Sequence, residues 1–435
     1  MISLVELLPG LPYGLQWRLV LIPLITGVIG YGTNWVAIRM LFHPVDFAGF
    51  RLPGLKSVAP ALPRKIQQIP GVMEGLVGWQ GIIPSRSARM GTIAAEKGIA
   101  RIATEREFYE EFDPEEIATH IVTNSEDELR QLTDEALREE HPGLWTDTPK
   151  PVRELIHARV QAQLPRIADE ITEQIGENID ELLDINLMIT NHLDENPELL
   201  NRLFLEVGDR ELKFIVNSGF LLGTFLGVFT IPLFLYIDRW WVLPMAGVAV
   251  GYMTNWIALK IIFLPIEERR IGPFRLQGLF IKRQPEAAEK YAEIVADEIV
   301  TISNVAENLM YGSQSDRTRK MIRDAIRPEV DRAVGLAGPL VRVTTGSDEY
   351  ERLRDRFAEE SVDRTISPLS DPEFNAERSE SIRRLIRERI QNLTPENFVQ
   401  LLRPAFIEDE WMLIVLGAVL GFVAGWLQLL VVTAV

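Results

Sequence analysis

Apolar and polar positions separate along the chain into four long apolar runs and two long polar blocks. Each run lacks charged residues over about 20 positions, the length that a helix needs to cross a bilayer. The runs cover residues 19–38, 214–237, 240–259 and 411–435. A soluble core helix of this length without a charge is uncommon. The pattern therefore predicts an integral membrane protein with four transmembrane helices.

The runs and blocks together give a layout for the whole chain. The predicted segments are a periplasmic tail at 1–18, transmembrane helices at 19–42, 214–237, 240–263 and 411–435, a periplasmic turn at 238–239, and cytoplasmic helical domains at 43–213 and 264–410. The tail lacks the basic region and the cleavage site of a signal peptide, so we expect the first run to be a retained span.

Both polar blocks have the periodicity of amphipathic helices. Apolar residues recur at three- and four-residue steps, which places them on one face of a helix. One such stripe is Tyr291, Ile294, Val295, Ile299, Ile302 and Val305, and a second is Leu164, Ile167, Ile171, Ile175, Ile179, Leu182 and Leu183. Strand-like alternation is scarce. We therefore predict an all-α fold in which helices of the two blocks pack against each other.

Basic residues near the apolar runs predict the orientation in the membrane. Those that follow the first and third runs include Arg39, Arg51, Lys56, Lys260, Arg269 and Arg270. The opposite ends offer only Arg18 and Arg239. Lys and Arg accumulate in cytoplasmic loops of membrane proteins. Both polar blocks are therefore expected in the cytoplasm.

One segment, GYGTNWVAIRMLFHP, occurs twice in related form. The first copy begins at Gly30, and the second, GYMTNWIALKIIFLP, begins at Gly251, an offset of 221, with eight identical positions. Farther on, QGII at Gln80 matches QGLF at Gln277 at an offset of 197, so the first half carries a 24-residue insertion. The chain is therefore predicted to be internally duplicated, with spans one and three as a parallel repeat.

The paired segments resemble the bacterial membrane family catalogued as domain of unknown function 445. So do NPELLNRLFLEVGDRELKFIVNSGFLLG, residues 196–223, and PENFVQLLRPAFIEDEWMLIVLGAVLGFVAGWLQ, residues 395–428. The resemblance covers nearly the whole chain, with four separated motifs in the same order. It implies an integral protein of the cytoplasmic membrane and implies no particular biochemical activity.

The two Thr-Asn-Trp triplets are the candidate site, because an unpaired amide in hydrocarbon costs several kcal/mol. The ligand or packing candidates are Thr33, Asn34, Trp35, Arg39, Thr254, Asn255, Trp256 and Lys260. Gly30 and Gly251 lie one turn before the asparagines and would let a neighbouring helix approach. We expect the triplets to dock spans one and three around a pseudo-twofold axis.

Two other interpretations of the triplets remain open. They could form a polar site in the bundle that grips a lipid headgroup, a peptide or an ion, or they could break a helix whose carbonyls line a cavity. Elsewhere, glycines at four-residue spacing predict tightly packed spans. These are Gly219, Gly223 and Gly227 in the second run and Gly417, Gly421 and Gly425 in the fourth.

Composition argues against several classes of function. The chain has no cysteine, so it has no disulfide and no thiolate metal site. A net charge of −17 disfavours nucleic acid as a partner. The five histidines lack metal-ligand spacing, and no phosphate-binding loop or nucleophile elbow occurs. We predict no enzymatic activity, no cofactor and no metal.

The leading functional hypothesis is a non-catalytic scaffold or tether of the cell envelope. The expected partners are membrane lipids and either a second copy of the chain or other envelope proteins. The alternative is an oligomeric channel, transporter or lipid-handling protein with a polar site at the triplets. The four apolar runs hold no Asp, Glu, Lys, Arg or His, one of which a coupled transporter normally needs within the membrane. This absence disfavours the transporter.

Overall fold

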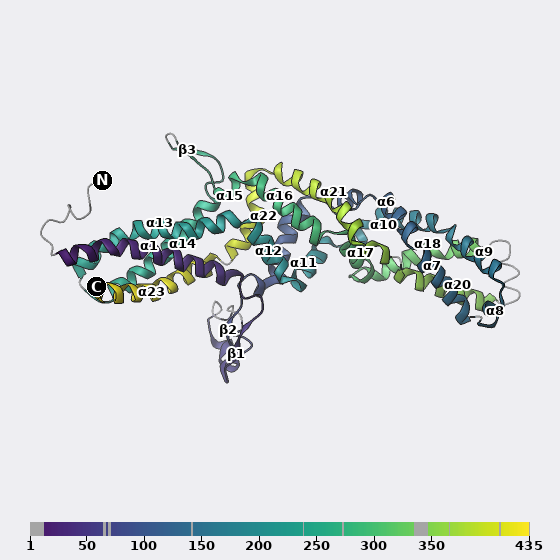
Figure 1. Ribbon diagram of the computed structural model, residues 1–435, viewed down its shortest axis with the longest axis horizontal. Helices are drawn as coiled ribbons and strands as arrows, with labels where there is room; N and C mark the ends of the chain where they lie inside the picture. The colour runs from purple at the N-terminus through teal and green to yellow at the C-terminus, as the bar shows by residue number, and fades with distance from the viewer. Residues whose placement is uncertain are drawn as a thin grey trace. The chain divides into compact units, whose positions relative to one another are not determined.

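The computed structural model describes residues 13–63, 67, 71–140, 142–237, 239–271, 274–334, 347–364, 366–408 and 410–434 (Figure 1). The chain divides into two compact units. Unit 1 comprises Met1–Gly98, Leu193–Lys290 and Ile390–Val435, and unit 2 comprises Ile99–His192 and Tyr291–Arg389. Each polar block therefore contributes helices to both units, and the units do not coincide with the halves of the chain.

Four helices of unit 1 are long and apolar enough to cross a membrane. They are α1 (Tyr13–Phe42), α13 (Asp209–Ile237), α14 (Val242–Phe263) and α23 (Glu410–Ala434). The predicted all-α fold with four transmembrane helices is thereby confirmed. Residues 1–12 of the predicted periplasmic tail, and Asp238 of the predicted turn, lie outside the described residues.

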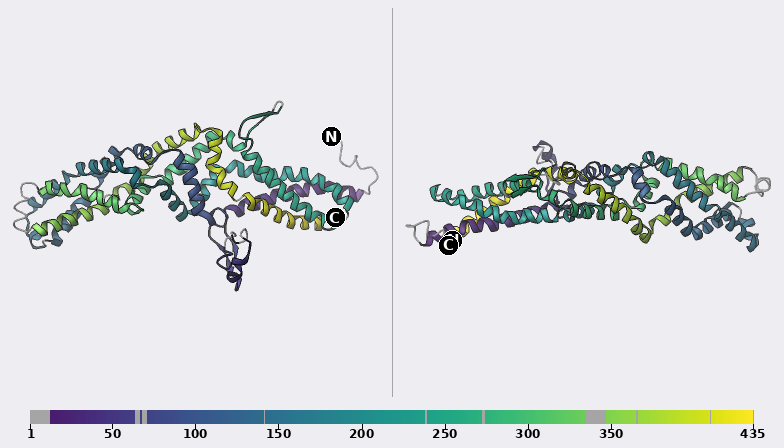
Figure 2. Two further views of the ribbon diagram at one scale, coloured as in Figure 1. Left: turned by 180° about the vertical axis from the view of Figure 1, so that it is seen from behind. Right: turned by 90° about the horizontal axis from the view of Figure 1, so that it is seen from above.

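The four membrane helices form two pairs, with α1 against α13 and α14 against α23. The pairs also touch each other, because α13 contacts α14 and α1 contacts α23. All four lie side by side in each view (Figures 1 and 2). The second pair repeats the first, which is the internal duplication that the sequence predicts.

The duplication continues into the loops that follow α1 and α14. Gly81 donates its backbone N–H to the Pro44 carbonyl at 2.8 Å, and Gly278 donates to the Pro265 carbonyl at 2.9 Å. The glutamine before each glycine donates its side-chain amide to the residue after the proline. Gln80 Nε2 lies 2.7 Å from the Val45 carbonyl, and Gln277 Nε2 lies 3.3 Å from the Ile266 carbonyl. The two sequence offsets therefore describe equivalent three-dimensional joints.

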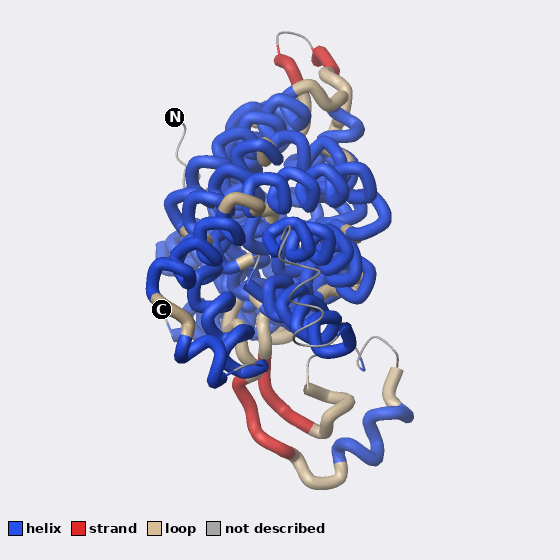
Figure 3. The backbone as a smooth tube through the Cα atoms, turned by 90° about the vertical axis from the view of Figure 1, so that its right-hand side faces the viewer, coloured by secondary structure: helices blue, strands red, loops and turns tan. Residues whose placement is uncertain are grey.

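Each joint carries a short antiparallel hairpin that the sequence did not predict. The first pairs β1 (Ala48–Arg51) with β2 (Leu76–Trp79), and the second pairs β3 (Arg269–Ile271) with β4 (Phe274–Leu276). The hairpins stand at opposite edges of unit 1 (Figure 3). The predicted insertion falls in the long β1–β2 connection, which covers positions 52–75, whereas the β3–β4 connection covers only positions 272–273.

Unit 1 also contains a second matched pair of helices, α12 (Pro197–Val207) and α22 (Pro395–Glu408). Both begin with a proline in the first turn, where its missing N–H costs nothing. In the first half, Asn201 donates to the Phe42 carbonyl at 2.7 Å and so joins α12 to the end of α1. The repeat thus extends to the segments that enter spans two and four.

Unit 2 consists of helices from both polar blocks. From the first block come α5 (Glu105–Glu111), α6 (Pro114–Asn124), α7 (Glu126–Glu140), α8 (Pro142–Asp147), α9 (Lys150–Gln161), α10 (Leu164–Leu182) and most of α11 (Ile185–Glu195). From the second come the last turn of α16 (Gln284–Ile294), α17 (Ile302–Tyr311), α18 (Ser315–Val334), α20 (Ser347–Arg364) and most of α21 (Pro372–Gln391). Contacts such as α10 with α18 and α7 with α20 join the blocks.

Both predicted apolar stripes point into the core of unit 2, with Ile167 alone only partly buried. The continuous helix expected through Tyr291–Val305 is wrong in one respect. The helix ends before Thr301, and Thr301 caps α17 by accepting a hydrogen bond from the Asn304 backbone N–H at 3.1 Å. In the first block, Thr104 caps α5 in the same way. A side-chain cap of this kind favours a new helix start over a continued helix.

Candidate functional site

The two asparagines of the triplets are buried and hold helices together. Asn34 Nδ2 donates to the Ile215 carbonyl of α13 at 2.8 Å, and Asn255 Nδ2 donates to the Leu413 carbonyl of α23 at 2.9 Å. Their exposed fractions are 0% and 3%. Interhelical bonds of this type contribute roughly 0.6–2 kcal/mol in membranes. The asparagines therefore act at equivalent places in the two pairs.

The expected docking of span one on span three is wrong in its choice of partner. Each asparagine bonds to the span that follows it, so α1 is joined to α13 and α14 to α23. The physical reason is the glycine stripe on the following span. There the neighbouring backbone comes close enough for the asparagine amide to reach its carbonyl.

Glycines from both helices face each other at these contacts. A Cβ added to Gly30 would clash with the Gly219 carbonyl, and one added to Gly251 would clash with the Gly417 carbonyl. The same holds for Gly247 and Gly421, one turn away. The backbones therefore touch directly, which confirms the tight packing that the small-residue stripes predict.

The threonines of the triplets are satisfied within their own helices. Thr33 Oγ1 donates to the Gly30 carbonyl at 3.1 Å, and Thr254 Oγ1 donates to the Gly251 carbonyl at 3.3 Å. A threonine hydroxyl commonly bonds one turn back in a helix. One polar atom per triplet stays open: within the described residues, the Oδ1 atoms of Asn34 and Asn255 have no hydrogen-bond partner.

The tryptophans face away from the helix contacts. Trp35 is 50% exposed and Trp256 is 44% exposed. The Arg39 guanidinium lies 5.8 Å from the Trp35 ring centroid, and the Lys260 ammonium lies 6.0 Å from that of Trp256, both within cation–π range. Aromatic and basic residues of this kind gather where a membrane helix meets water. In each triplet the asparagine therefore contacts the paired helix, and the tryptophan lies on the exposed outer face.

Two contacts in the membrane unit were missed by reasoning from the sequence. Gln428 Nε2 of α23 donates to Thr26 Oγ1 at 3.0 Å and to the Ile22 carbonyl at 3.2 Å, both in α1. Gln428 is 4% exposed. Its signal was available, because a glutamine stands alone in the fourth apolar run. The other contact, from Asn201 to the end of α1, has no local sequence signal.

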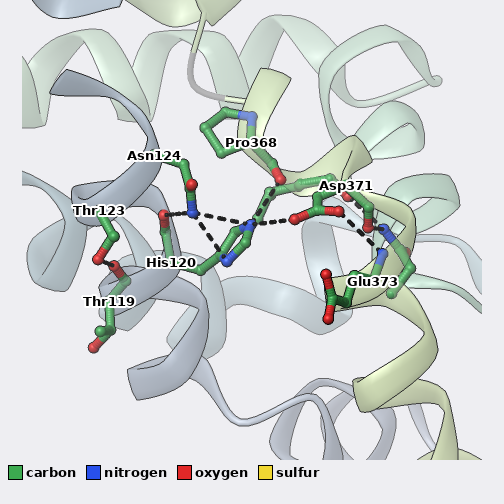
Figure 4. Close-up of polar contacts among 9 residues, drawn as sticks. Thr119, His120, Thr123, Asn124, Pro368, Asp371 and Glu373 are labelled. Carbon is green, nitrogen blue, oxygen red and sulfur yellow. Dashed lines mark hydrogen bonds and ion pairs between the residues drawn. The ribbon is translucent and has the colours of Figure 1, made fainter. Parts of the chain in front are cut away.

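A separate polar cluster in unit 2 joins the two polar blocks (Figure 4). His120 Nε2 donates to the Pro368 carbonyl at 3.0 Å, and Asn124 Nδ2 lies 3.2 Å from His120 Nδ1. The imidazole also stacks on Phe374, with ring centroids 3.8 Å apart. His120 Nε2 thus joins α6 to the segment before α21, and His120 Nδ1 contacts Asn124 within α6. Within the described residues, no group of three His, Asp or Glu side chains could hold a metal ion.

Comparisons with known proteins give one group of relatives. Over 133 residues, 29% of this chain, it is 30% identical to a UPF0754 membrane protein of a Synechococcus strain. It is 37% identical over 73 residues to one from Halalkalibacterium halodurans, 16% of this chain and 19% of that one, and 28% identical over 89 residues to one from Staphylococcus epidermidis, 20% of this chain and 23% of that one.

The matched segment spans about a third of the length of the Synechococcus relative, 31%. No family model and no solved structure matches the chain. These relatives are membrane proteins by name, in agreement with the four apolar helices of unit 1. The chain is a membrane protein similar to the bacterial UPF0754 membrane proteins.

Proposed function

We propose that this membrane protein is a non-catalytic scaffold or tether of the cell envelope. In this proposal unit 1 is the anchor in the cytoplasmic membrane, both polar blocks lie in the cytoplasm, and unit 2 carries the surface for a second copy or another envelope protein. The proposal also extends the likeness from the UPF0754 proteins to the family of domain of unknown function 445.

The observation that carries the proposal is the use of the repeated polar motif. Both asparagine amides bond to backbone carbonyls of the paired helix, and both threonines bond within their own helix. Directly opposed glycines close the same interfaces. The most polar part of the membrane unit therefore supports anchoring, since its donors are already engaged in helix contacts.

Lipids are the partner proposed for the outer faces of α1 and α14. Tyr31, Trp35 and Arg39 follow each other at four-residue steps on α1, so they share one face. The aromatic residues of this stripe are about half exposed. An aromatic belt ending in a cation matches the boundary between hydrocarbon and anionic headgroups. This supports a cytoplasmic position for the ends of α1 and α14.

The test is reconstitution of the purified full chain into liposomes loaded with carboxyfluorescein or with a pH-sensitive dye. We expect dye leakage and proton flux equal to those of protein-free liposomes. Flux that requires the protein and disappears in the Asn255→Ala variant would overturn the scaffold. That variant removes only one interhelical hydrogen bond, so we expect it to insert like the natural chain. Flotation of the variant with the liposomes checks its insertion.

Lipid handling is the second candidate, and one observation favours it. Unit 2 contains a cavity of about 460 Å³ with a mainly apolar lining. Pockets for small molecules usually measure about 300–1,000 Å³. The cavity lies outside the membrane helices, so this candidate does not need the polar site at the triplets.

A further inference from the structure

The cavity of unit 2 lies among helices α7, α9, α10 and α18, with α20 completing its wall. Its lining includes Leu132, Ala136, Leu155, Ile167, Ile171 and Ile326. Protein interiors are close-packed, and voids larger than a water molecule are few. A cavity of about 460 Å³ is too large for a packing defect.

The cavity is elongated along α7. Its lining residues there run from Ser125, immediately before α7, to Leu137 within α7. This is about 18 Å along a helix axis at 1.5 Å per residue. An apolar slot that extends this far along one helix suits an extended hydrocarbon chain better than a compact ring system.

One side of the cavity opens to solvent beneath α9. Val152 and Leu155 line the cavity, yet they are 45% and 56% exposed. They share one helical face with Arg159, because the three residues follow at steps of three and four. Arg159 also lines the cavity and is exposed, so this cationic residue lies at the opening.

The other charged lining residues have contacts within the protein. Glu128 accepts a hydrogen bond from Ser367 Oγ at 2.8 Å, and Arg364 donates to Glu135 at 2.7 Å. Glu329 is paired with Arg332. Arg159 is therefore the lining charge best placed to meet a ligand at the opening, and its sign selects an anionic group.

We infer that unit 2 binds a single acyl chain with an anionic headgroup, the chain in the slot and the headgroup at Arg159. Both a free fatty acid and an anionic lysophospholipid have this chemistry, and the membrane that holds unit 1 is a source of either. The inference goes beyond the scaffold, since a scaffold needs no ligand.

The test uses the full chain in lipid nanodiscs with a photoreactive long-chain fatty acid, followed by peptide mass spectrometry. We expect labelled peptides from α7, α9, α10 or α18, in addition to peptides from the membrane helices. Competition with unlabelled fatty acid or with lysophosphatidylglycerol then identifies the source, because the natural type removes the unit 2 labels at lower concentration. Labels confined to the membrane helices would overturn the inference.

Two variants separate binding from folding. Ala136→Phe fills the slot and should remove the unit 2 labels, while Ala158→Phe, on the exposed side of α9 away from the cavity, should keep them. Labelling of the membrane helices is the internal standard for both. Equal unit 2 labelling in the two variants contradicts a ligand in the slot.

The surface variant Arg159→Glu tests the headgroup without touching the core. Loss of a charged hydrogen bond lowers affinity about tenfold, so unit 2 labelling by the fatty acid should fall by that factor. Labelling by the matching uncharged photoreactive alcohol should not fall. A parallel loss for both probes would contradict an anionic headgroup at Arg159. Failure of this assay leaves the liposome result unchanged, so the two proposals are distinguishable.

Discussion

The helices of the two units pack in different ways: those of unit 1 touch backbone to backbone, and those of unit 2 surround a cavity. In unit 1, α1 meets α13, and α14 meets α23, through glycines whose backbones touch, with one asparagine amide crossing each interface. In unit 2, large aliphatic side chains from both polar blocks meet around a cavity of about 460 Å³. One unit leaves no room for a single added methyl group at its contacts, and the other leaves room for a ligand.

The difference follows from the solvent around each unit. Lipid tails are as apolar as leucine, so membrane helices gain little from burying apolar surface and depend on close contact and hydrogen bonds. Helices in water gain about 25 cal/mol for each Å² of apolar surface buried. Such a unit can therefore retain an opening and stay folded. We therefore expect added side-chain volume and lost hydrogen bonds to destabilise unit 1, and added side-chain volume to be tolerated at the cavity of unit 2.

The largest effect should come from adding volume to the membrane contacts. Gly30→Leu places a side chain against the Gly219 backbone, which cannot move aside cheaply. Overpacking costs about 1–3 kcal/mol in ordinary cores, and a clash with backbone lies at the upper end. We expect a large loss of monodisperse protein in mild detergent and a lowered unfolding temperature. The control is Gly32→Leu, where a Cβ meets nothing within 4 Å, and an equal loss there would contradict direct backbone contact.

The asparagines should give the next largest effect. Asn34→Ala and Asn255→Ala each remove one interhelical hydrogen bond, worth roughly 0.6–2 kcal/mol. Because the two bonds lie in different helix pairs, their effects on the free energy of unfolding should add. Thr254→Val is the control, since its hydroxyl bonds only within α14. If Thr254→Val lowered the free energy of unfolding as much as Asn255→Ala, the interhelical amide bonds would not be the cause of the loss.

Adding volume to unit 2 should have a small effect of the opposite sign. Ala136→Leu extends into the cavity, and filling a cavity commonly stabilises by about 0.5–2 kcal/mol. Calorimetry of the full chain would measure this as an unchanged or raised unfolding temperature for unit 2. A destabilisation comparable to that of Gly30→Leu would show that the two units are equally close-packed.

The smallest expected effect is a dependence of the stability of unit 2 on acidic pH. The hydrogen bond from the Thr104 backbone N–H, with a further contribution from Arg389, lowers the pKa of the Glu107 carboxyl in unit 2 below its ordinary value. The stabilisation is therefore present at neutral pH and is lost as the pH falls through the folded value. Glu107→Gln should be slightly less stable at pH 7 and should match the natural chain only once the pH is below the lowered folded pKa, which itself lies below the ordinary carboxyl value of about 4.3. Hydrogen exchange of α5 against pH would show whether the two curves converge.

Much of the membrane unit could be predicted from the sequence, because lipid imposes simple rules. Charge-free runs located the four helices, and the glycine spacing indicated their tight faces. The partner of Asn34 could not be predicted, since the Ile215 carbonyl is a backbone atom with no side-chain signal. The hairpins were missed for a related reason: β3 and β4 have three residues each, too few for a pattern of alternation.

Unit 2 was predictable in its helices and not in its assembly. The buried stripe through Ile171 and Ile175 followed from helical periodicity. The break before Thr301 depends on a side-chain cap that competes with an otherwise continuous apolar stripe. The cavity depends on how five helices from two distant segments meet, and periodicity along one helix carries no information on that.

The most direct test of the central claim, that the repeated polar motif is a closed packing contact, uses the absence of cysteine from the chain. Thr254→Cys introduces one nearly isosteric thiol beside an intact Asn255, at a position that is 0% exposed. Membranes opened to both sides are treated with a water-soluble maleimide, with Phe50→Cys on the 65% exposed β1 strand as the reactive control. We predict labelling at position 254 only after denaturation in detergent. Labelling in intact membranes at a rate near that of the control would show a water-filled polar site, and would contradict the account.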